Sequence, residues 1–138
     1  MDEDFEKVNI EELTKRLLKF CKLDKNGRIF ITDKELIQKL TIKDKILITL
    51  SARYLANKLD SNIQPAVSSE EIARFFSDKK EVIYARAKEL KDDGKISIKE
   101  RGTYLIYPFQ IDDFITYLET RWIKWKIVNS KNFILKMN

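Results

Sequence analysis

The sequence predicts a mainly α-helical fold with one small β-hairpin. Apolar residues recur at helical spacing in several segments, and most of these segments open with a helix-capping motif. Residues 96–107 instead alternate apolar and polar side chains around Gly102, which is the pattern of a half-buried hairpin. With 138 residues, of which 43% are hydrophobic, the chain can form one domain with a buried core and additional terminal elements.

The composition excludes several classes of protein. The chain has no His and a single Cys, Cys21, so it can form neither an internal disulfide framework, nor a zinc site of His and Cys, nor a His-based catalytic triad. No apolar run approaches about 18 residues, and no apolar segment follows the acidic first residues. We therefore expect a cytoplasmic protein without a membrane span, a secretory signal, a metal or a cofactor.

The net charge is mildly positive. The chain has 27 Lys and Arg against 22 Asp and Glu, a formal charge of +5, and such a balance favours an acidic partner such as nucleic acid. The last 18 residues, from Arg121, contain five basic residues and no acidic one. A solvated surface can carry the same balance without any partner, so the charge alone leaves both interpretations open.

Residues 1–40 are predicted to form an N-terminal helical extension with a short strand. A capping box at residues 9–12 begins a helix whose apolar face includes Cys21, which we interpret as a small core residue. A β-prone strand over residues 29–31 follows, and then a short helix capped by Thr32.

Residues 41–108 are predicted to form one compact unit. A long helix capped by Thr41 is followed by a loop, a short helix opened by Ser68, a three-residue break, a longer helix capped by Ser77 or Asp78 and ending before Gly94, and the hairpin. This order describes a winged helix-turn-helix, in which the short helix supports the longer one. The longer helix then projects outward at a width that a DNA major groove accepts. Its predicted inner face contains Ile83, Ala87 and Leu90.

Residues 109–138 are predicted to form an amphipathic helix followed by a basic tail without clear periodicity. Trp122 and Trp125 continue the apolar stripe of this helix and fit a core or a dimer interface. The neighbouring basic residues leave a second interpretation open, in which the two indoles stack on single-stranded bases. Helices at both ends of a winged helix can form the interface of a homodimer that binds a palindromic site.

Two segments resemble prokaryotic winged-helix transcriptional regulators. Residues 68–73, Ser-Ser-Glu-Glu-Ile-Ala, are similar to the start of the first helix of the motif, and residues 82–96 resemble the recognition helix and the start of the wing. Two residues depart from the pattern of these regulators. A Leu is commoner at the position of Ala87, and an apolar residue is commoner at the position of Lys95. The resemblance covers residues 42–107, and the abundance of Lys and Ile is typical of archaeal and other AT-rich genomes.

The resemblance implies a module that binds double-stranded DNA as a homodimer, with helix 78–92 in the major groove and wing 95–107 on the backbone. The positions of the basic and aromatic residues in that helix and wing give seven candidate DNA-binding residues. These are Lys79, Lys80, Tyr84, Arg86, Lys88, Lys99 and Arg101.

A protein-interaction adaptor is the alternative function. The segment from Ser77 to Asp93 carries five basic and five acidic residues, a more neutral balance than a helix that seeks phosphates usually has, and winged helices also bind proteins. An enzyme is not expected, because no nucleophile–base pair or metal-ligand constellation is visible. The acids Asp112 and Asp113 fit the first turn of a helix. The DNA sequence and any effector ligand are not predicted.

Overall fold

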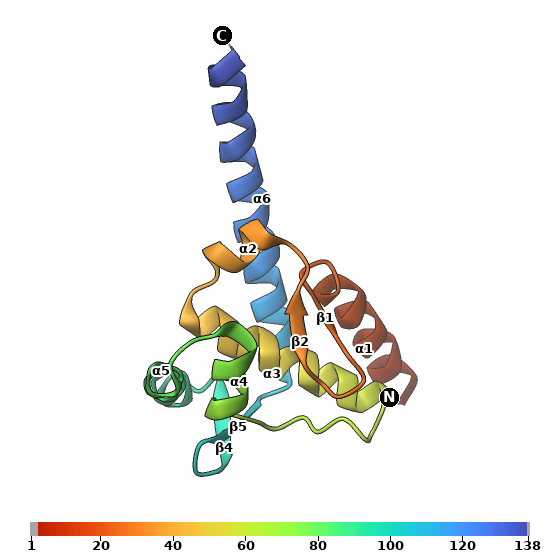
Figure 1. Cartoon of the computed structure of the whole chain (residues 1–138). Helices are drawn as coiled ribbons and strands as arrows, with labels where there is room; N and C mark the ends of the chain where they lie inside the picture. Colours follow the sequence, from red (N-terminus) through yellow and green to blue (C-terminus); the bar gives the residue numbers. More distant parts are fainter. Residues whose placement is uncertain (1–2, 138) are drawn as a thin grey trace.

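The fold is mainly helical with two small antiparallel sheets, as Figure 1 shows for the computed structural model. The structure describes the backbone of residues 3–137 and the side chains of residues 9–126. In chain order the elements are α1 (Glu3–Leu17), β1 (Cys21–Leu23), β2 (Ile29–Ile31), α2 (Lys34–Lys39), α3 (Ile42–Leu59), β3 (Val67–Ser68), α4 (Ser69–Phe76), α5 (Lys80–Asp92), β4 (Ile96–Glu100), β5 (Thr103–Ile106) and α6 (Phe109–Met137).

The predicted hairpin is confirmed as β4 and β5, and the structure adds strands that the sequence did not reveal. The strand β3 pairs with β5 through Val67 and Tyr104, giving a three-stranded sheet in the order β3-β5-β4. The predicted strand over residues 29–31 pairs with β1, where Cys21 lies opposite Ile31. Both additional strands are short, so their backbone pairing, rather than any side-chain period, defines them.

The core is organised around α3, which crosses the middle of the molecule (Figure 1). This helix contacts α1, α4, α5, α6 and strands of both sheets. Its successive residues Ile46, Leu47 and Ile48 are all buried, as expected for a helix that is covered on nearly every side. The predicted cap at Thr41 is confirmed, because its hydroxyl accepts from the Asp44 N–H at 3.1 Å. The structure adds the reciprocal bond of a capping box, in which the Asp44 carboxylate accepts from the Thr41 N–H at 3.0 Å.

Three predictions for the N-terminal region were wrong. The helix α1 begins before Asn9, which therefore lies inside it, and it ends at Leu17. Cys21 is buried as predicted, but it lies in β1, because the chain after Leu17 pairs with β2 instead of continuing the helix. The cap of α2 is Asp33, whose carboxylate accepts from two main-chain N–H groups at 2.8 and 3.3 Å, and not Thr32.

The C-terminal helix is longer than the sequence predicted. Its inner face, with Ile111, Ile115 and Leu118, packs in the core as expected. The segment from Asn129, predicted as a tail without periodicity, continues α6 through Met137, and this part of the helix extends away from the body (Figure 1). Among residues 3–137, no helix is long and apolar enough to cross a membrane.

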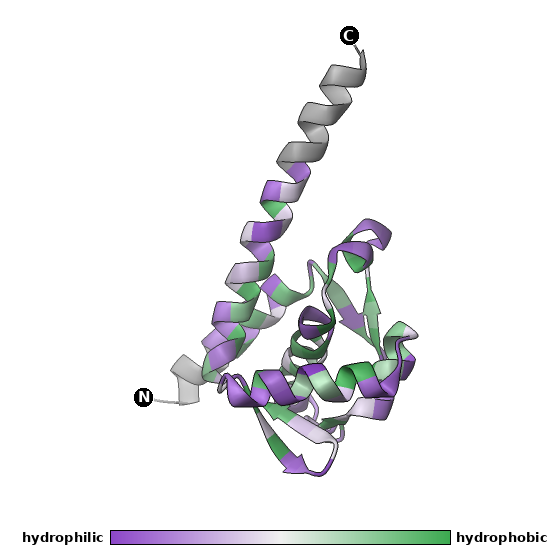
Figure 2. Cartoon of the chain, turned by 90° about the vertical axis from the view of Figure 1, so that its left-hand side faces the viewer, coloured by the Kyte–Doolittle hydropathy of each residue, from purple (hydrophilic) through white to green (hydrophobic). Residues whose placement is uncertain are grey.

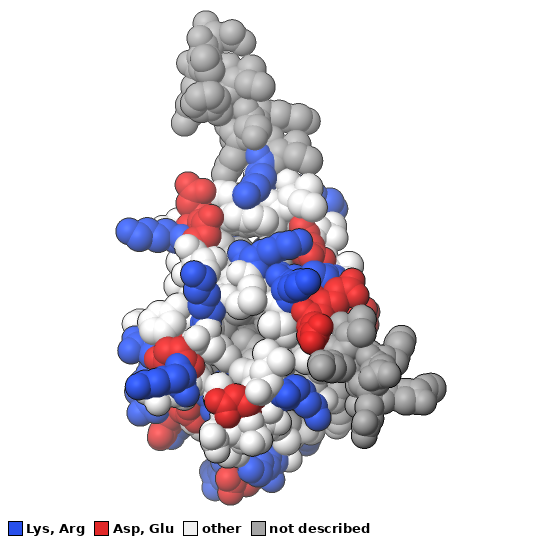
Figure 3. Space-filling view, turned by 90° about the vertical axis from the view of Figure 1, so that its right-hand side faces the viewer, with Lys and Arg blue, Asp and Glu red and all other residues white. Residues whose placement is uncertain are grey.

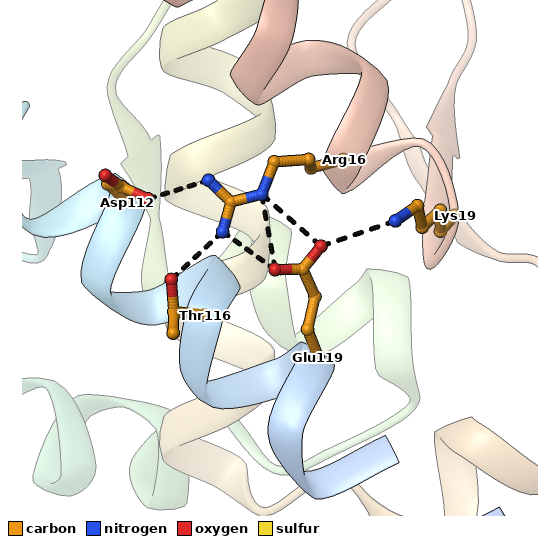
Figure 4. Close-up of polar contacts among 5 residues, drawn as sticks. All are labelled: Arg16, Lys19, Asp112, Thr116 and Glu119. Atoms are coloured by element: carbon orange, nitrogen blue, oxygen red, sulfur yellow. Dashed lines mark hydrogen bonds and ion pairs between the residues drawn. The ribbon is translucent and has the colours of Figure 1, made fainter. Parts of the chain in front are cut away.

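A polar cluster joins the end of α1 to the N-terminal part of α6 (Figure 4). The guanidinium of Arg16 donates to Glu119 at 2.7 Å, to Asp112 at 2.7 Å and to the Thr116 hydroxyl at 3.0 Å. The ammonium of Lys19 adds a longer contact to Glu119 at 3.4 Å. The hydrogen bond to Arg16, more than any other contact, lowers the pKa of Glu119 below its ordinary value.

Candidate nucleic-acid interface

The short helix α4 is defined at both ends by its own sequence. The Ser68 hydroxyl accepts from the Glu71 N–H at 3.1 Å, so the predicted cap at Ser68 is confirmed. The helix ends at Ser77, which adopts the left-handed conformation with φ = 58°. This left-handed residue ends the helix, and α5 begins after only a short break, at Lys80.

The break between α4 and α5 is held against α3 by an ion pair. Asp78 was a predicted cap of α5, but its carboxylate instead binds the Lys45 ammonium at 2.9 Å, and both side chains are mostly buried. The N-cap position of α5 falls on Lys79, which makes no side-chain capping hydrogen bond. The carboxylate of Asp78 thus connects the turn to the central helix.

The helix α5 is anchored by one face only. Ile83, Ala87 and Leu90, the predicted inner residues, are at most 2% exposed, and α5 contacts α3 and α4. In Figure 2, α5 lies across the front of the molecule, with the β4–β5 hairpin projecting below it. The remaining faces of the helix are therefore accessible to a partner.

A groove of about 620 Å³ lies between α5, the start of α4 and the hairpin tip. Three of the predicted residues line it: Lys80 and Tyr84 from α5, and Arg101 from the tip. Tyr84 is 44% exposed, so its ring is available to a ligand in the groove. Arg101 follows Tyr84 by 17 positions in the sequence, and the fold brings the hairpin tip beside α5.

The other predicted residues are also exposed, but they lie outside this groove. Lys88 follows Tyr84 by one helical turn, Lys79 precedes α5, and Lys99 lies on β4 beside the tip. Among the residues whose side chains the structure describes, none of these three ammonium groups forms an ion pair. They are therefore free to bind an anion.

Two predicted cations contact carboxylates of the protein itself. The Lys80 ammonium binds Glu70 at 2.9 Å, and this hydrogen bond raises the pKa of Lys80 and lowers the pKa of Glu70. Both side chains are more than half exposed, so water screens the pair and its strength is small. Arg86 binds Glu89 at 2.7 Å, on the flank of α5 where Lys43 of α3 also approaches Glu89 at 3.7 Å.

The groove contains residues that the sequence analysis did not single out. Glu70 and Glu81 add negative charge to its wall. Behind the wall, the Ser69 and Tyr104 hydroxyls lie 3.0 Å apart in a buried hydrogen bond that joins α4 to β5. No sequence signal identifies these contacts, because Glu70–Lys80 and Ser69–Tyr104 depend on the tertiary arrangement.

No metal centre accompanies this face. Among the described residues, no cluster of three or more Cys, Asp or Glu side chains has the geometry to hold a metal ion.

No protein-family model matches the chain, and comparisons with curated proteins and with solved structures find no match.

Proposed function

We propose that residues 41–108 act as a winged helix-turn-helix that binds double-stranded DNA, with α5 in the major groove and the β4–β5 tip on the phosphate backbone. The observation that carries the proposal is the packing of α5, which is buried along a single face and exposed elsewhere. An exposed helix of this width fits a major groove. The hairpin tip beside it carries Lys99 and Arg101, which suit phosphate contacts.

The charge around α5 supports binding to the backbone. Lys79, Lys88, Lys99 and Arg101 have no acidic partner among the described residues. The Lys80 ammonium is already paired with the Glu70 carboxylate, so a phosphate gains less from Lys80 than from the four unpaired cations. This division between free and paired cations predicts which side chains dominate the affinity.

A salt titration tests the proposal. If the four unpaired cations each neutralise one phosphate, the log–log slope of affinity against salt is about −3.6 for each protomer. The double variant Lys99→Ala/Arg101→Ala should reduce the slope by about 1.8. Lys34→Ala, a single charge removed on α2, should leave the slope unchanged, and a flat titration for the wild-type chain would reject DNA binding.

We further propose that the protein acts as a homodimer through α6, which suits a cytoplasmic transcriptional regulator of a palindromic site. The support is the extension of α6 beyond the body through Met137. The half-buried rings of Trp122 and Trp125 stack with centroids 4.8 Å apart at the point where the helix leaves the body. Light scattering at micromolar concentration tests this, since a monomer of 16.4 kDa as the only species excludes the dimer.

The adaptor remains the second candidate, and a specific observation favours it. Val82, Tyr84 and Ile98 are exposed by 39–44% on α5 and β4, and exposed apolar side chains suit a protein partner. Capture of a stoichiometric partner from nuclease-treated lysate, together with absent DNA binding, would establish this function instead.

A further inference from the structure

One row of side chains on α5 points directly away from the core. Two positions along a helix correspond to a rotation of about 200° around its axis, so each buried residue has an outward neighbour two positions before it. The buried residues are Ile83, Ala87 and Leu90. Their outward neighbours, which we call the outward row, are all exposed and are Glu81, Ala85 and Lys88.

The carboxylate of Glu81 is available to a ligand. The N-cap of α5 is Lys79, so Glu81 is the second residue of the helix. It forms no ion pair with any residue whose side chain the structure describes, whereas Glu70, the other acid of the groove, binds Lys80 at 2.9 Å. Since Glu81 also lines the groove, its oxygens can accept hydrogen bonds from a molecule that binds there.

An exposed acid is by itself an ordinary feature of this protein. Figure 3 shows the face opposite to α5, where acidic and basic side chains are interspersed with uncharged surface. An acid in the first turn of a helix is also favourable for the helix dipole. Glu81 is therefore distinguished by its place in the outward row and not by its charge.

Two cations of α5 lie on its flanks. Lys80 lies on the side of α4, where it contacts Glu70, and Arg86 lies on the side of α3, where it contacts Glu89. When a helix lies in a major groove, its flanks face the phosphates and its outward row faces the base edges. Glu81 is thus directed toward the bases, where a carboxylate meets hydrogen-bond donors instead of phosphate charge.

The chemistry of the base edges determines which base suits this carboxylate. In the major groove, guanine presents the acceptors N7 and O6 and thymine presents the acceptor O4. Adenine presents an amino group beside the acceptor N7, whereas cytosine presents its N4 amino group without a neighbouring acceptor. Because a carboxylate only accepts hydrogen bonds, it is attracted most to cytosine.

We propose that Glu81 selects a cytosine in the major groove by accepting a hydrogen bond from its N4 amino group. This selection rests on the proposed binding of duplex DNA by α5, and it specifies the duplex, which contains a C·G pair opposite the first turn of the helix. The N-terminal residues of a recognition helix are those that reach base edges. Ala85, the next residue of the outward row, is small and allows the helix to approach the bases closely.

Selection of binding sites from random duplexes identifies the position that Glu81 contacts. The full wild-type chain should select sites that share a C·G pair, once in each half-site if the protein is a dimer. Glu81→Gln should select an A·T pair at that position, because the amide is complementary to N6 and N7 of adenine. The other positions of the selected site should stay the same.

Four duplexes that differ only at this pair measure the preference. By fluorescence anisotropy, the wild type should bind the C·G duplex about 5- to 150-fold more tightly than the other three, and in Glu81→Ala the four affinities should converge. Glu70→Gln is the matched control, because it removes the same charge from the groove wall and should change all four affinities by one factor. A cooperative thermal transition shows that each variant is folded.

Three results would overturn the role of Glu81 and leave the proposed function standing. The first is a set of wild-type sites that share no C·G pair. The second is an unchanged preference for C·G in Glu81→Ala, which would assign that pair to another residue. The third is an equal gain in affinity for all four duplexes in Glu81→Ala, which would reduce the carboxylate to a repulsive charge. Absence of salt-dependent binding of the wild type to any duplex would instead reject the proposed function, and the selection of a cytosine with it.

Discussion

The exposed pair between Lys80 and Glu70 makes a quantitative prediction about DNA binding. In the wild-type chain Lys80 is held by Glu70 at 2.9 Å, so it contributes little to phosphate binding. Glu70→Gln removes the competing charge and leaves the ammonium free. The variant should therefore neutralise one more phosphate than the wild type, while the fold stays intact because both side chains are exposed.

The magnitude follows from the number of free cations. Four phosphate contacts give a slope of about −3.6, and a fifth contact gives about −4.5. Between about 50 and 200 mM salt, the wild type should lose about 150-fold in affinity and Glu70→Gln about 500-fold. Fluorescence anisotropy of a labelled duplex measures both slopes directly.

Lys80→Ala completes the thermodynamic cycle for this pair. In the wild-type background it should change the slope little, whereas in the Glu70→Gln background it should return the slope to about −3.6. Glu35→Gln, an exposed acid in the first turn of α2, is the matched control and should have no effect. If Glu70→Gln and Glu35→Gln change the slope equally, the gain reflects net charge, and the assignment of Lys80 to the interface is wrong.

Three further predictions concern stability and the buried thiol. Arg16→Ala should lower the free energy of unfolding in urea by about 1–3 kcal/mol, because it removes charge-assisted hydrogen bonds to Glu119 and Asp112. Arg28→Ala, on the β1–β2 turn, is the control. An equal loss of unfolding free energy in Arg28→Ala would contradict this reasoning. Arg16 lowers the folded-state pKa of Glu119. The stability that the ionised Glu119 carboxylate contributes is therefore complete above its unfolded-state pKa of about 4.3, and it is lost as the pH falls through the folded-state pKa. Glu119→Gln should therefore flatten the stability profile at that acidic end, and an unchanged profile would count against it. Burial raises the pKa of Cys21 to about 12, so iodoacetamide should modify it at pH 8 only after unfolding; rapid labelling of folded protein would show that β1 opens.

The parts of the fold that were predicted correctly depend on neighbours in sequence. Thr41 and Ser68 cap their helices through hydrogen bonds to residues three positions ahead, and Ile83, Ala87 and Leu90 form one face by helical periodicity alone. Such contacts can be derived from spacing, because both partners lie within one turn of the same helix.

The missed features depend on partners far away in the sequence. Cys21 continues the apolar spacing of α1, yet it joins a strand because Ile31 lies opposite it. Asp78 has the sequence context of a helix cap, but Lys45 of α3 takes its carboxylate. The candidate site shows the same division: all seven predicted residues are exposed, but the pairing of Lys80 with Glu70 across the α4–α5 break appears only in three dimensions.

The most direct test of the account is to map the surface that contacts a DNA duplex by amide chemical-shift changes in an isotope-labelled full-length chain. Binding through α5 and the hairpin tip predicts shifts concentrated at residues 79–88 and 99–103, with little change in β1 and β2. Shifts that concentrate on α1 and the β1–β2 sheet, or no shifts at low salt, would contradict the proposal that α5 and the hairpin form the DNA-binding face.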